Sequence, residues 1–247
     1  MSHLMNNYGR LPVSFDHGQG VWLWDKEGHK YLDALAGIAV NSVGHAHPRL
    51  VRAIADQASK LIHCSNYFNI DLQEQVAEKL VEHSGLEAVF FCNSGLEANE
   101  CAIKIARKFG HAKGIETPNI IVLKHAFHGR SIATLSATGN PSVREDFSPY
   151  TEGFIFVDES DLDGIRKIVE ENKNVVAIFF EPILGEGGVV PIDLSVIKGI
   201  REICDEHDLL MMCDEVQCGM GRSGKWFAHQ WAEIKPDVIT MAKGLAG

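Results

Sequence analysis

The 247-residue sequence lacks a long apolar run and lacks a stretch dense in lysine and arginine. No apolar run approaches the roughly 20 residues that cross a bilayer, which argues against a membrane-spanning helix. Basic residues number 23 against 33 acidic ones, so the net charge is −10, whereas a duplex-binding face needs many basic contacts to phosphate. We therefore expect neither a membrane nor a nucleic acid as a partner.

Closely paired cysteines and an apolar leader are missing as well. The six cysteines include no CxxC pair, and Cys92, Cys204 and Cys213 lie in apolar stretches. This pattern predicts buried thiols rather than disulfides or metal ligands. Residues 1–13 contain no apolar signal core, so the cytoplasm is the expected compartment.

Regular alternation of strand-like and helix-like patterns is what the sequence does contain. Continuous apolar runs rich in Val, Ile and Phe predict strands buried on both faces of a parallel sheet. The runs are Ala88–Cys92, Ile120–Leu123, Phe154–Val157, Val175–Phe180, Leu209–Cys213 and Val238–Met241. Helical patterns lie between them at Glu97–Phe109, Asp161–Glu171 and Leu194–His207. The alternation predicts an α/β fold with a doubly wound, mostly parallel sheet.

The first part of the chain has a different pattern. Two short strands are predicted at 21–25 and 30–33, around a turn at 26–28. A link rich in glycine and histidine follows at 41–48, and helical periodicity begins at Arg49, with a second helix at 71–83. We therefore expect residues 1–48 to form a segment distinct from a larger domain at 49–247.

Chemistry-bearing side chains follow the predicted strands, where doubly wound sheets bind ligands. The turn at 93–96 leads directly into a helix, which predicts either a phosphate cradle or an ordinary helix cap. Phe127 could stack on a planar ligand and Arg130 could bind a carboxylate, or the pair could be a core aromatic and a surface arginine. Glu181 follows a buried strand, where a charge needs a partner.

Two further strand ends complete the set. Asp214 is placed to meet a cation inside a cleft, and Lys243 is either a desolvated nucleophile or a surface lysine. Together these strand ends fit one ligand, pyridoxal phosphate. They offer a phosphate site, an aromatic ring for stacking, an acid for the ring nitrogen and a lysine for the carbonyl.

Seven motifs extend this pattern along the whole chain. They are Gly37–Asn41, Gly44–Pro48, Asn93–Glu100, Ala126–Arg130, Glu181–Gly188, Asp214–Gly224 and Ala242–Gly247. On these motifs the sequence resembles the class III, fold type I, pyridoxal-phosphate aminotransferases, most nearly the members that act on N-acetylornithine. The resemblance implies the large domain of that fold at 49–247, and a part of the small domain at 1–48.

The resemblance implies roles around the cofactor ring. Lys243 would carry the cofactor as a Schiff base and move the proton between substrate and cofactor, and Asp214 would pair with the pyridine nitrogen. Phe127 would stack on one ring face and Val216 on the other, while Gln217 would contact the 3-hydroxyl.

It also implies a phosphate site at Ser94, Gly95 and Leu96, partly through backbone N–H groups. The family more often has Thr or Ala where Leu96 stands, a change that spares a backbone contact but removes a hydroxyl.

For the substrate, the resemblance implies that Arg130 takes a carboxylate and that Glu181 and Glu186 line the site. Ile38 stands where ornithine aminotransferases tend to carry a tyrosine, which favours an acetylated substrate.

The implied reaction passes the δ-amino group of N-acetylornithine to 2-oxoglutarate, giving N-acetylglutamate 5-semialdehyde and glutamate, a step of arginine biosynthesis. Succinyldiaminopimelate, succinylornithine and ornithine remain alternative substrates. Family members form homodimers and continue well beyond the position of Lys243. We therefore expect this chain to be an N-terminal piece, and an inactive fragment that acts only as an interaction partner is a further alternative.

Two other classes of site deserve comparison. Gly219, Gly221 and Gly224 match a dinucleotide-binding GxGxxG, but residues 214–218 separate them from the strand and a poor helix start follows. His45, His47 and Asp33 are candidate metal ligands. The two histidines stand close together, but no further residue has the spacing of a metal ligand to them, so we expect no metal site.

Overall fold

The computed structural model describes residues 3–247, which divide into two compact units. The first comprises residues up to Ser65 together with Gly247, and the second comprises Asn66–Ala246. The predicted boundary between residues 48 and 49 remains a prediction about domains, because compactness alone divides the chain later, after α2 (Pro48–Ala58).

The first unit is built around a small antiparallel sheet. Its strands pair in the order β1 (Phe15–Gln19), β2 (Trp22–Asp25) and β3 (Lys30–Leu32). The two predicted strands are confirmed as β2 and β3, and β1 is an additional strand. A short turn of helix, α1 (Ala36–Ala39), and α2 follow. None of the described apolar side chains of this unit is fully buried.

The second unit contains a sheet of parallel strands in the order β10-β9-β6-β4-β5. This confirms the predicted α/β class. The strands are β4 (Asn119–Leu123), β5 (Phe154–Val157), β6 (Val175–Phe180), β9 (Leu210–Asp214) and β10 (Val238–Thr240), with β7 (Ile183–Leu184) and β8 (Val190–Pro191) in a separate hairpin. The helices are α3 (Asp71–Ser84), α4 (Gly95–Ala112), α5 (Ile132–Ala137), α6 (Pro141–Arg144), α7 (Leu162–Glu171) and α8 (Leu194–His207), with 3₁₀ turns η1 (Ala228–Ala232) and η2 (Lys243–Ala246).

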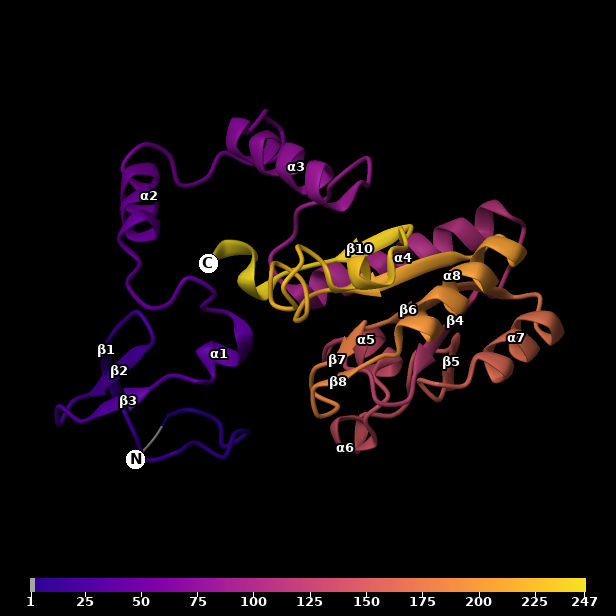
Figure 1. The fold of residues 1–247 in the computed structure, drawn as a ribbon, viewed down its shortest axis with the longest axis horizontal. Helices are drawn as coiled ribbons and strands as arrows, with labels where there is room; N and C mark the ends of the chain where they lie inside the picture. The colour runs from indigo at the N-terminus through magenta and orange to yellow at the C-terminus, as the bar shows by residue number, and fades with distance from the viewer. Residues whose placement is uncertain (1–2) are drawn as a thin grey trace. The chain divides into compact units, whose positions relative to one another are not determined.

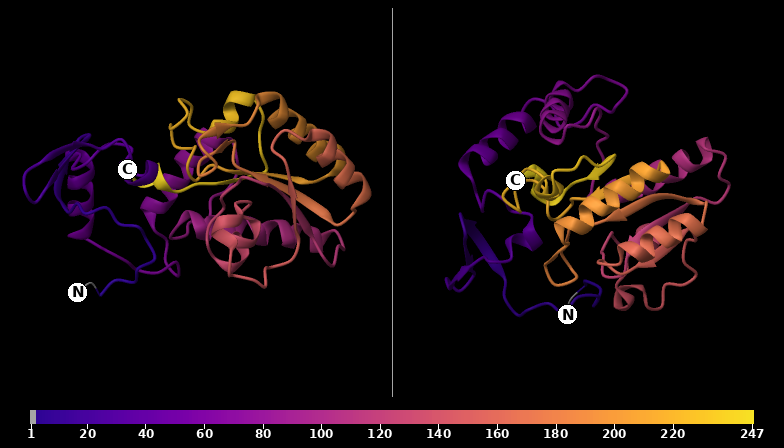
Figure 2. Two further views of the ribbon diagram at one scale, coloured as in Figure 1. Left: turned by 90° about the horizontal axis from the view of Figure 1, so that it is seen from below. Right: turned by 45° about the vertical axis from the view of Figure 1, so that its right-hand side comes forward.

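Helices cover both faces of this sheet, as the strand alternation requires. Ile120, Val122, Phe179 and Met212 pack with α4 on one face. The intervening residues, such as Phe180, pack with α7 and α8 on the other face. Within this unit, Figure 1 and the left view of Figure 2 show α4 on one side of the strands and α8 on the other. All six residues of β6 are buried, which explains its unbroken apolar sequence.

The prediction of a strand at Ala88–Cys92 is wrong. The segment belongs to no helix or strand, and Phe90 is 70% exposed. An apolar run becomes a strand only where a neighbouring strand accepts its backbone hydrogen bonds, and the described residues supply none here. For the same reason Cys92 is exposed, which corrects the prediction of a buried thiol, whereas Cys204 and Cys213 are buried as predicted.

The helices bear on membrane insertion. Among residues 3–247, every helix is too short or too polar to cross a bilayer.

Candidate functional site

The sheet changes winding direction between β4 and β6. After β4 the chain continues to β5 at one edge, and after β6 it continues towards β9 and β10 at the other edge. Such a switch point leaves a crevice at the carboxyl ends of the two strands. Here one hydrogen bond crosses the crevice: the Phe127 N–H donates to Glu181 Oε1 at 2.8 Å. The crevice therefore joins the segments at 124–131 and 181–188.

Glu181 is a buried carboxyl group in this crevice. Its other oxygen accepts the Gly185 N–H at 3.2 Å. Burial and the negative charge of Asp214 together raise the pKa of Glu181 to about 8, against the opposing effects of the two N–H donors and Lys243. Glu181 can therefore gain or lose a proton near neutral pH.

Asp214, the last residue of β9, is buried and held by three donors. Oδ2 accepts Asn99 Nδ2 at 2.7 Å and His128 Nδ1 at 2.8 Å, and Oδ1 accepts the Val216 N–H at 3.0 Å. Three donors around one buried carboxyl group fix its orientation. The arrangement provides a fixed carboxyl group at the end of the central strands.

Asn99 and His128 are the polar contacts that the sequence analysis missed. Asn99 lies in the buried stripe of α4, where the other buried positions are Ala102, Ile103, Ala106 and Gly110. A lone amide in an apolar stripe was the available signal, because a buried amide requires partners. His128 carried a weaker signal, since it is one polar residue in a polar segment.

Lys243 follows β10 and is half-buried. Burial lowers the pKa of its ammonium group, whereas the negative charges of Glu186, Glu181 and Asp214 act in the opposite direction. Its backbone φ is 40°, in the left-handed region that non-glycine residues rarely adopt. The lysine is therefore held in an unusual conformation within the influence of three carboxyl groups.

The start of α4 lies against the segments that follow β9 and β10. A Cβ atom at Gly95 would come within 2.6 Å of Val216 Cγ1 and 3.2 Å of the Ala242 Cβ. A Cβ atom at Gly185 would similarly meet the Gln217 side chain at 1.9 Å. Close approach requires glycine at position 95, whereas at position 185 the end of the flexible Gln217 side chain could move aside. The packing brings Val216 and Gln217 to the same end of the sheet.

The first turn of α4 is arranged to receive an anion. Ser94 caps the helix by accepting the Glu97 N–H at 3.2 Å, and the first intrahelical bond runs from Ala98 N–H to the Ser94 carbonyl at 3.0 Å. The described hydrogen bonds therefore leave the Gly95 and Leu96 N–H groups for a ligand. The positive end of the helix dipole acts in the same direction.

The structure places the remaining candidates less close together. Phe127 is half-buried, and the exposed Arg130 lies 5.8 Å from its ring centre. Glu186 is exposed in the turn after β7. Ile38 belongs to the first unit, where it is 51% exposed and has a φ of 66°, so its relation to the strand-end cluster remains a prediction.

The two alternative sites gain no support. Gly219 packs against Glu215, and the first helical turn after the glycine motif is the 3₁₀ turn η1 rather than an α-helix. His45 Nε2 lies 2.7 Å from Asp33 Oδ2 within the first unit, so the two side chains partner each other. Within residues 3–247, no three His, Cys, Asp or Glu side chains are grouped so as to hold a metal ion.

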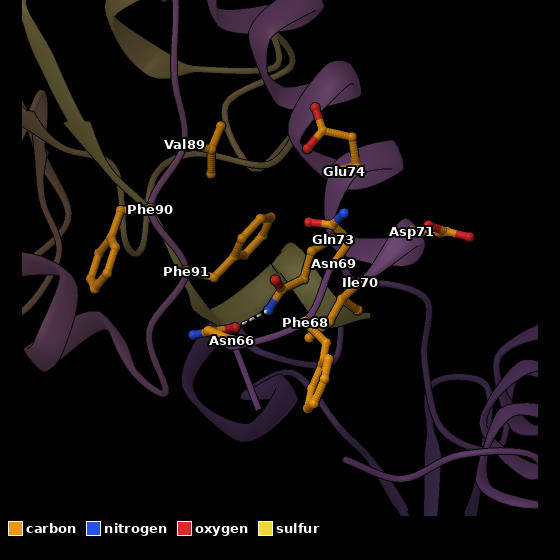
Figure 3. A pocket seen from close by; sticks show the side chains of 10 residues that line it. All are labelled: Asn66, Phe68, Asn69, Ile70, Asp71, Gln73, Glu74, Val89, Phe90 and Phe91. Carbon is orange, nitrogen blue, oxygen red and sulfur yellow. Dashed lines mark hydrogen bonds between the residues drawn. The ribbon is translucent and has the colours of Figure 1, made fainter. Parts of the chain in front are cut away.

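A separate pocket of about 560 Å³ lies between the start of α3 and the segment at 89–91 (Figure 3). Asn66, Phe68 and Phe91 are among its lining side chains, and Gln73 Nε2 donates to Asn66 Oδ1 at 3.4 Å. None of the candidate site residues lines it. The strand-end cluster is therefore the candidate site.

Known proteins are similar to this chain in both sequence and fold. The profile of the family described as aminotransferase class-III matches residues 4–247. An acetylornithine aminotransferase of Nitrosomonas europaea is 54% identical over 245 residues, which cover 99% of this chain and 62% of that protein. The chain thus spans less than two thirds of that relative.

Two solved structures are similar. The N-acetylornithine aminotransferase of Stenotrophomonas maltophilia superposes with a TM-score of 0.82 at 39% identity, over 96% of this chain and 59% of that one. An ornithine aminotransferase of Toxoplasma gondii, described with partial occupancy of PLP at its active site, gives a TM-score of 0.92 at 33% identity, over 98% of this chain and 57% of that one.

Proposed function

Because the chain belongs to the class-III aminotransferase family, we propose that it carries the pyridoxal-phosphate site of an enzyme that transfers the δ-amino group of N-acetylornithine to 2-oxoglutarate. The family is one of pyridoxal-phosphate enzymes. The products would be N-acetylglutamate 5-semialdehyde and glutamate, which would place the enzyme in arginine biosynthesis. The observation that carries the proposal is the half-buried Lys243, which follows β10 at the end of the sheet where Thr240 of β10 pairs with Asp214 of β9.

The residues of this end fit the cofactor. The buried Asp214 offers an anion to a ring nitrogen, and the α4 N-terminus offers N–H groups to a phosphate. The close approach at Gly95 brings that helix start to Val216, so the two binding elements adjoin. Bound there, pyridoxal phosphate supplies an aldehyde that takes up an amino group and a ring that withdraws electrons.

Asp214 and Lys243 would perform the central chemical work. Asp214 would keep a proton on the ring nitrogen, because its buried carboxylate gains more from a paired cation in the crevice than from water. Lys243 would use its Nζ to bond the aldehyde carbon and to carry a proton to and from the substrate. Burial lowers the pKa of Lys243, which increases the neutral, nucleophilic fraction of its amine.

The surrounding side chains would orient the cofactor and substrate. Phe127 and Val216 would hold the ring between them and exclude water, and Gln217 would bind its hydroxyl. Ser94, with the Gly95 and Leu96 N–H groups, would bind the phosphate. On the substrate side, Arg130 would bind a carboxylate, while Glu181 and Glu186 would face its polar groups.

Ornithine is the second candidate substrate, because the likeness to an ornithine aminotransferase structure is as extensive as that to the acetylornithine enzyme. Ile38 favours the acetylated substrate. The rate constants kcat/KM for the two amines, measured on one preparation with 2-oxoglutarate as acceptor, discriminate between them. A preference for ornithine would overturn the proposal for N-acetylornithine.

The wider setting is also proposed. We expect the full-length protein to be a homodimer in the cytoplasm, with residues 1–48 forming part of a small domain and 49–247 the cofactor-binding domain. Small-molecule substrates are the expected partners. Co-purification with a full-length homologue would instead support an interaction role without catalysis.

Covalent trapping tests the cofactor site directly. The chain is mixed with pyridoxal phosphate, its absorption spectrum is recorded, and borohydride reduction followed by peptide mapping locates the label. We expect a near-visible band and a single label on Lys243, both lost in Lys243→Arg. Lys124→Ala removes an exposed lysine and is the matched control. Label scattered over surface lysines would contradict the proposal.

A further inference from the structure

Two buried threonine hydroxyls hold the backbone on either side of Arg130. Thr138 Oγ1 donates to the Gly129 carbonyl oxygen at 3.2 Å. Thr134 Oγ1 accepts the Ser131 N–H at 3.0 Å. The first bond restrains the peptide group that precedes Arg130, and the second restrains the one that follows it. Both threonines are 0% exposed, so water does not compete for these bonds.

The two hydroxyls differ in what else they do. Thr134 completes a capping box at the start of α5, which is an ordinary way to begin a helix. Thr138 follows the last residue of α5. Its Oγ1 accepts the His128 N–H at 3.0 Å, and its proton faces the Gly129 and Thr134 carbonyl oxygens at 3.2 and 3.0 Å. Thr138 thus ties the end of α5 to the segment that precedes the arginine.

Gly129 makes this restraint necessary. Its φ of 127° is a conformation open to glycine, and no side chain limits the rotation of its peptide group. A Cβ atom there would come within 2.7 Å of Thr134 Oγ1, so a larger residue could not take over the task. The Gly129 carbonyl and the Arg130 N–H belong to one planar peptide group. The bond from Thr138 therefore sets the direction in which Arg130 leaves the backbone.

The Arg130 guanidinium has no polar partner to fix it. The side chain is exposed and lies 5.8 Å from the centre of the Phe127 ring. Within residues 3–247 it makes no ion pair and no hydrogen bond. A bidentate pair with a carboxylate requires two N–H groups in the correct orientation. That orientation depends here on the backbone of Arg130, and hence on the bonds that hold it.

Phe127, which would stack on the cofactor ring, is held by other bonds. Its N–H donates to Glu181 Oε1 at 2.8 Å. In the same peptide group, the Ala126 carbonyl oxygen accepts the Gly139 N–H at 2.8 Å. The peptide group that precedes Phe127 is therefore fixed without the Thr138 hydroxyl, whereas the one that precedes Arg130 is not.

We propose that Thr138 is a positioning residue that acts through Arg130. Its hydroxyl orients the peptide group before Arg130 and thereby directs the guanidinium at a carboxylate of the substrate. The hydroxyl thus contributes to the affinity for the substrate carboxylate and little to the affinity for the cofactor. The inference rests on the proposed function, because that function assigns the substrate carboxylate to Arg130.

Three substitutions separate the hydroxyl from the packing. Thr138→Val keeps the shape of the side chain and removes the hydroxyl, whereas Thr138→Ser keeps the hydroxyl. Thr117→Val is the matched control. The Thr117 hydroxyl accepts Asn174 Nδ2 at 3.0 Å just before β4, at the opposite end of that strand from the candidate site.

Glutarate is the probe, because it carries two carboxylates and neither an amine nor a keto group. Calorimetry measures its dissociation constant on chains loaded with pyridoxal phosphate, and an absorption titration measures that of the cofactor. The value for glutarate should rise about tenfold in Thr138→Val, since one bond of a charged pair contributes about that factor, and less than about twofold in Thr138→Ser and Thr117→Val. The value for the cofactor should change less than about twofold in all three.

Failure of the proposed function is distinguishable from failure of this inference. A wild-type chain that takes up no cofactor at Lys243 would overturn both. In a ¹⁵N-labelled, cofactor-loaded wild-type chain, the NMR signal of the Arg130 Nε–H group should shift when glutarate is added. A signal that does not shift would overturn the inference alone, and this measurement needs no variant to fold.

The variants can overturn the inference as well. Equal glutarate affinities of Thr138→Val and the wild type would do so. Equal weakening of glutarate and cofactor binding would indicate a purely structural role, and a Thr138→Ser variant as weak as Thr138→Val would exclude the hydroxyl as the cause. If Thr138→Val does not fold, Thr138→Cys, which keeps a weaker donor, takes its place. An unchanged glutarate affinity in Thr138→Cys would then overturn the inference.

Discussion

Asp214 and Glu215 are adjacent in sequence, but their carboxylates enter two different regions. The alternation of β9 sends Met212 and Asp214 towards α4, where Asn99 is a partner. Glu215 instead accepts from the segment at 228–229.

The two carboxylates differ in how completely they are satisfied. Glu215 Oε1 accepts the His229 N–H and Nδ1 at 2.8 and 2.9 Å, and Oε2 accepts the Ala228 N–H and Cys218 Sγ at 2.8 and 3.2 Å. All four of its acceptor sites are used, whereas Asp214 retains one. A buried acid with four internal donors stabilises structure, and one with a spare site can hold a ligand.

The largest expected effect is the loss of stability when Glu215, whose acceptor sites are all used, is replaced. Glu215→Leu leaves the buried His229 and two backbone N–H groups without acceptors, so we expect a loss of about 3–5 kcal/mol in the free energy of unfolding. Urea denaturation measures it. Glu171→Leu, at an exposed position, should change the value by less than about 0.5 kcal/mol. A stability loss no larger than that of the control would break the distinction between the two acids.

The second effect is a pH dependence of the unfolding free energy that comes from Glu181, the acid coupled to Asp214. The folded-state pKa of Glu181 is raised from its ordinary 4.5 to about 8. A raised pKa means that the protonated group favours the folded state, so this contribution is complete below about pH 4.5 and is lost as the pH rises to about 8. The unfolding free energy of the wild type should therefore fall across this range, relative to Glu181→Gln, by on the order of a few kcal/mol.

Asp214→Asn provides the matching check. Because the charge of Asp214 contributes to the raised pKa of Glu181, the substitution should lower that pKa, as measured by ¹³C NMR of the Glu181 carboxyl group. An unchanged titration of Glu181 would show that the two acids are not coupled.

The third effect concerns the close packing at the start of α4. Gly95→Ala places a methyl group 2.6 Å from Val216 Cγ1, so we expect a loss of about 1–3 kcal/mol and weaker cofactor binding. Gly9→Ala, where a Cβ meets nothing within 4 Å, is the control for adding a methyl group. Thermal unfolding and a cofactor titration give both quantities. Equal effects of the two substitutions would contradict a requirement for close approach.

The smallest effect is electrostatic. Removing the exposed charge in Glu186→Gln should lower the pKa of Lys243 slightly, because that charge now raises it. The pH dependence of Lys243 labelling by an amine-reactive reagent should shift to lower pH, with no change in Glu171→Gln. A shift to higher pH would contradict the expectation that the Glu186 charge raises the pKa of Lys243.

Much of this fold was predictable from the sequence because its local patterns are strong. The helices at 161–171 and 194–207 and the buried strand at 175–180 lie within a residue of their predicted bounds. The segment at 88–92 was not predictable in the same way, because whether an apolar run becomes a strand depends on a neighbouring strand.

The residues of the candidate site likewise divide into those that the sequence identified and those that it did not. Lys243, Asp214 and Phe127 were recognisable because each follows a strand-like run or lies within a recognisable motif. His128 and Asn99 were not, because they acquire importance only by meeting Asp214, from which they are 86 and 115 residues distant in sequence.

The sequence by itself therefore determined most strands of the parallel sheet, the long helices and the reactive side chains that follow the strands, since these depend on residue type and on spacing within a few positions. Only the tertiary structure decided which acid is saturated and which keeps a free acceptor site. The number of donors around a buried carboxylate depends on distant segments meeting in space. That number separates Asp214 from the adjacent Glu215.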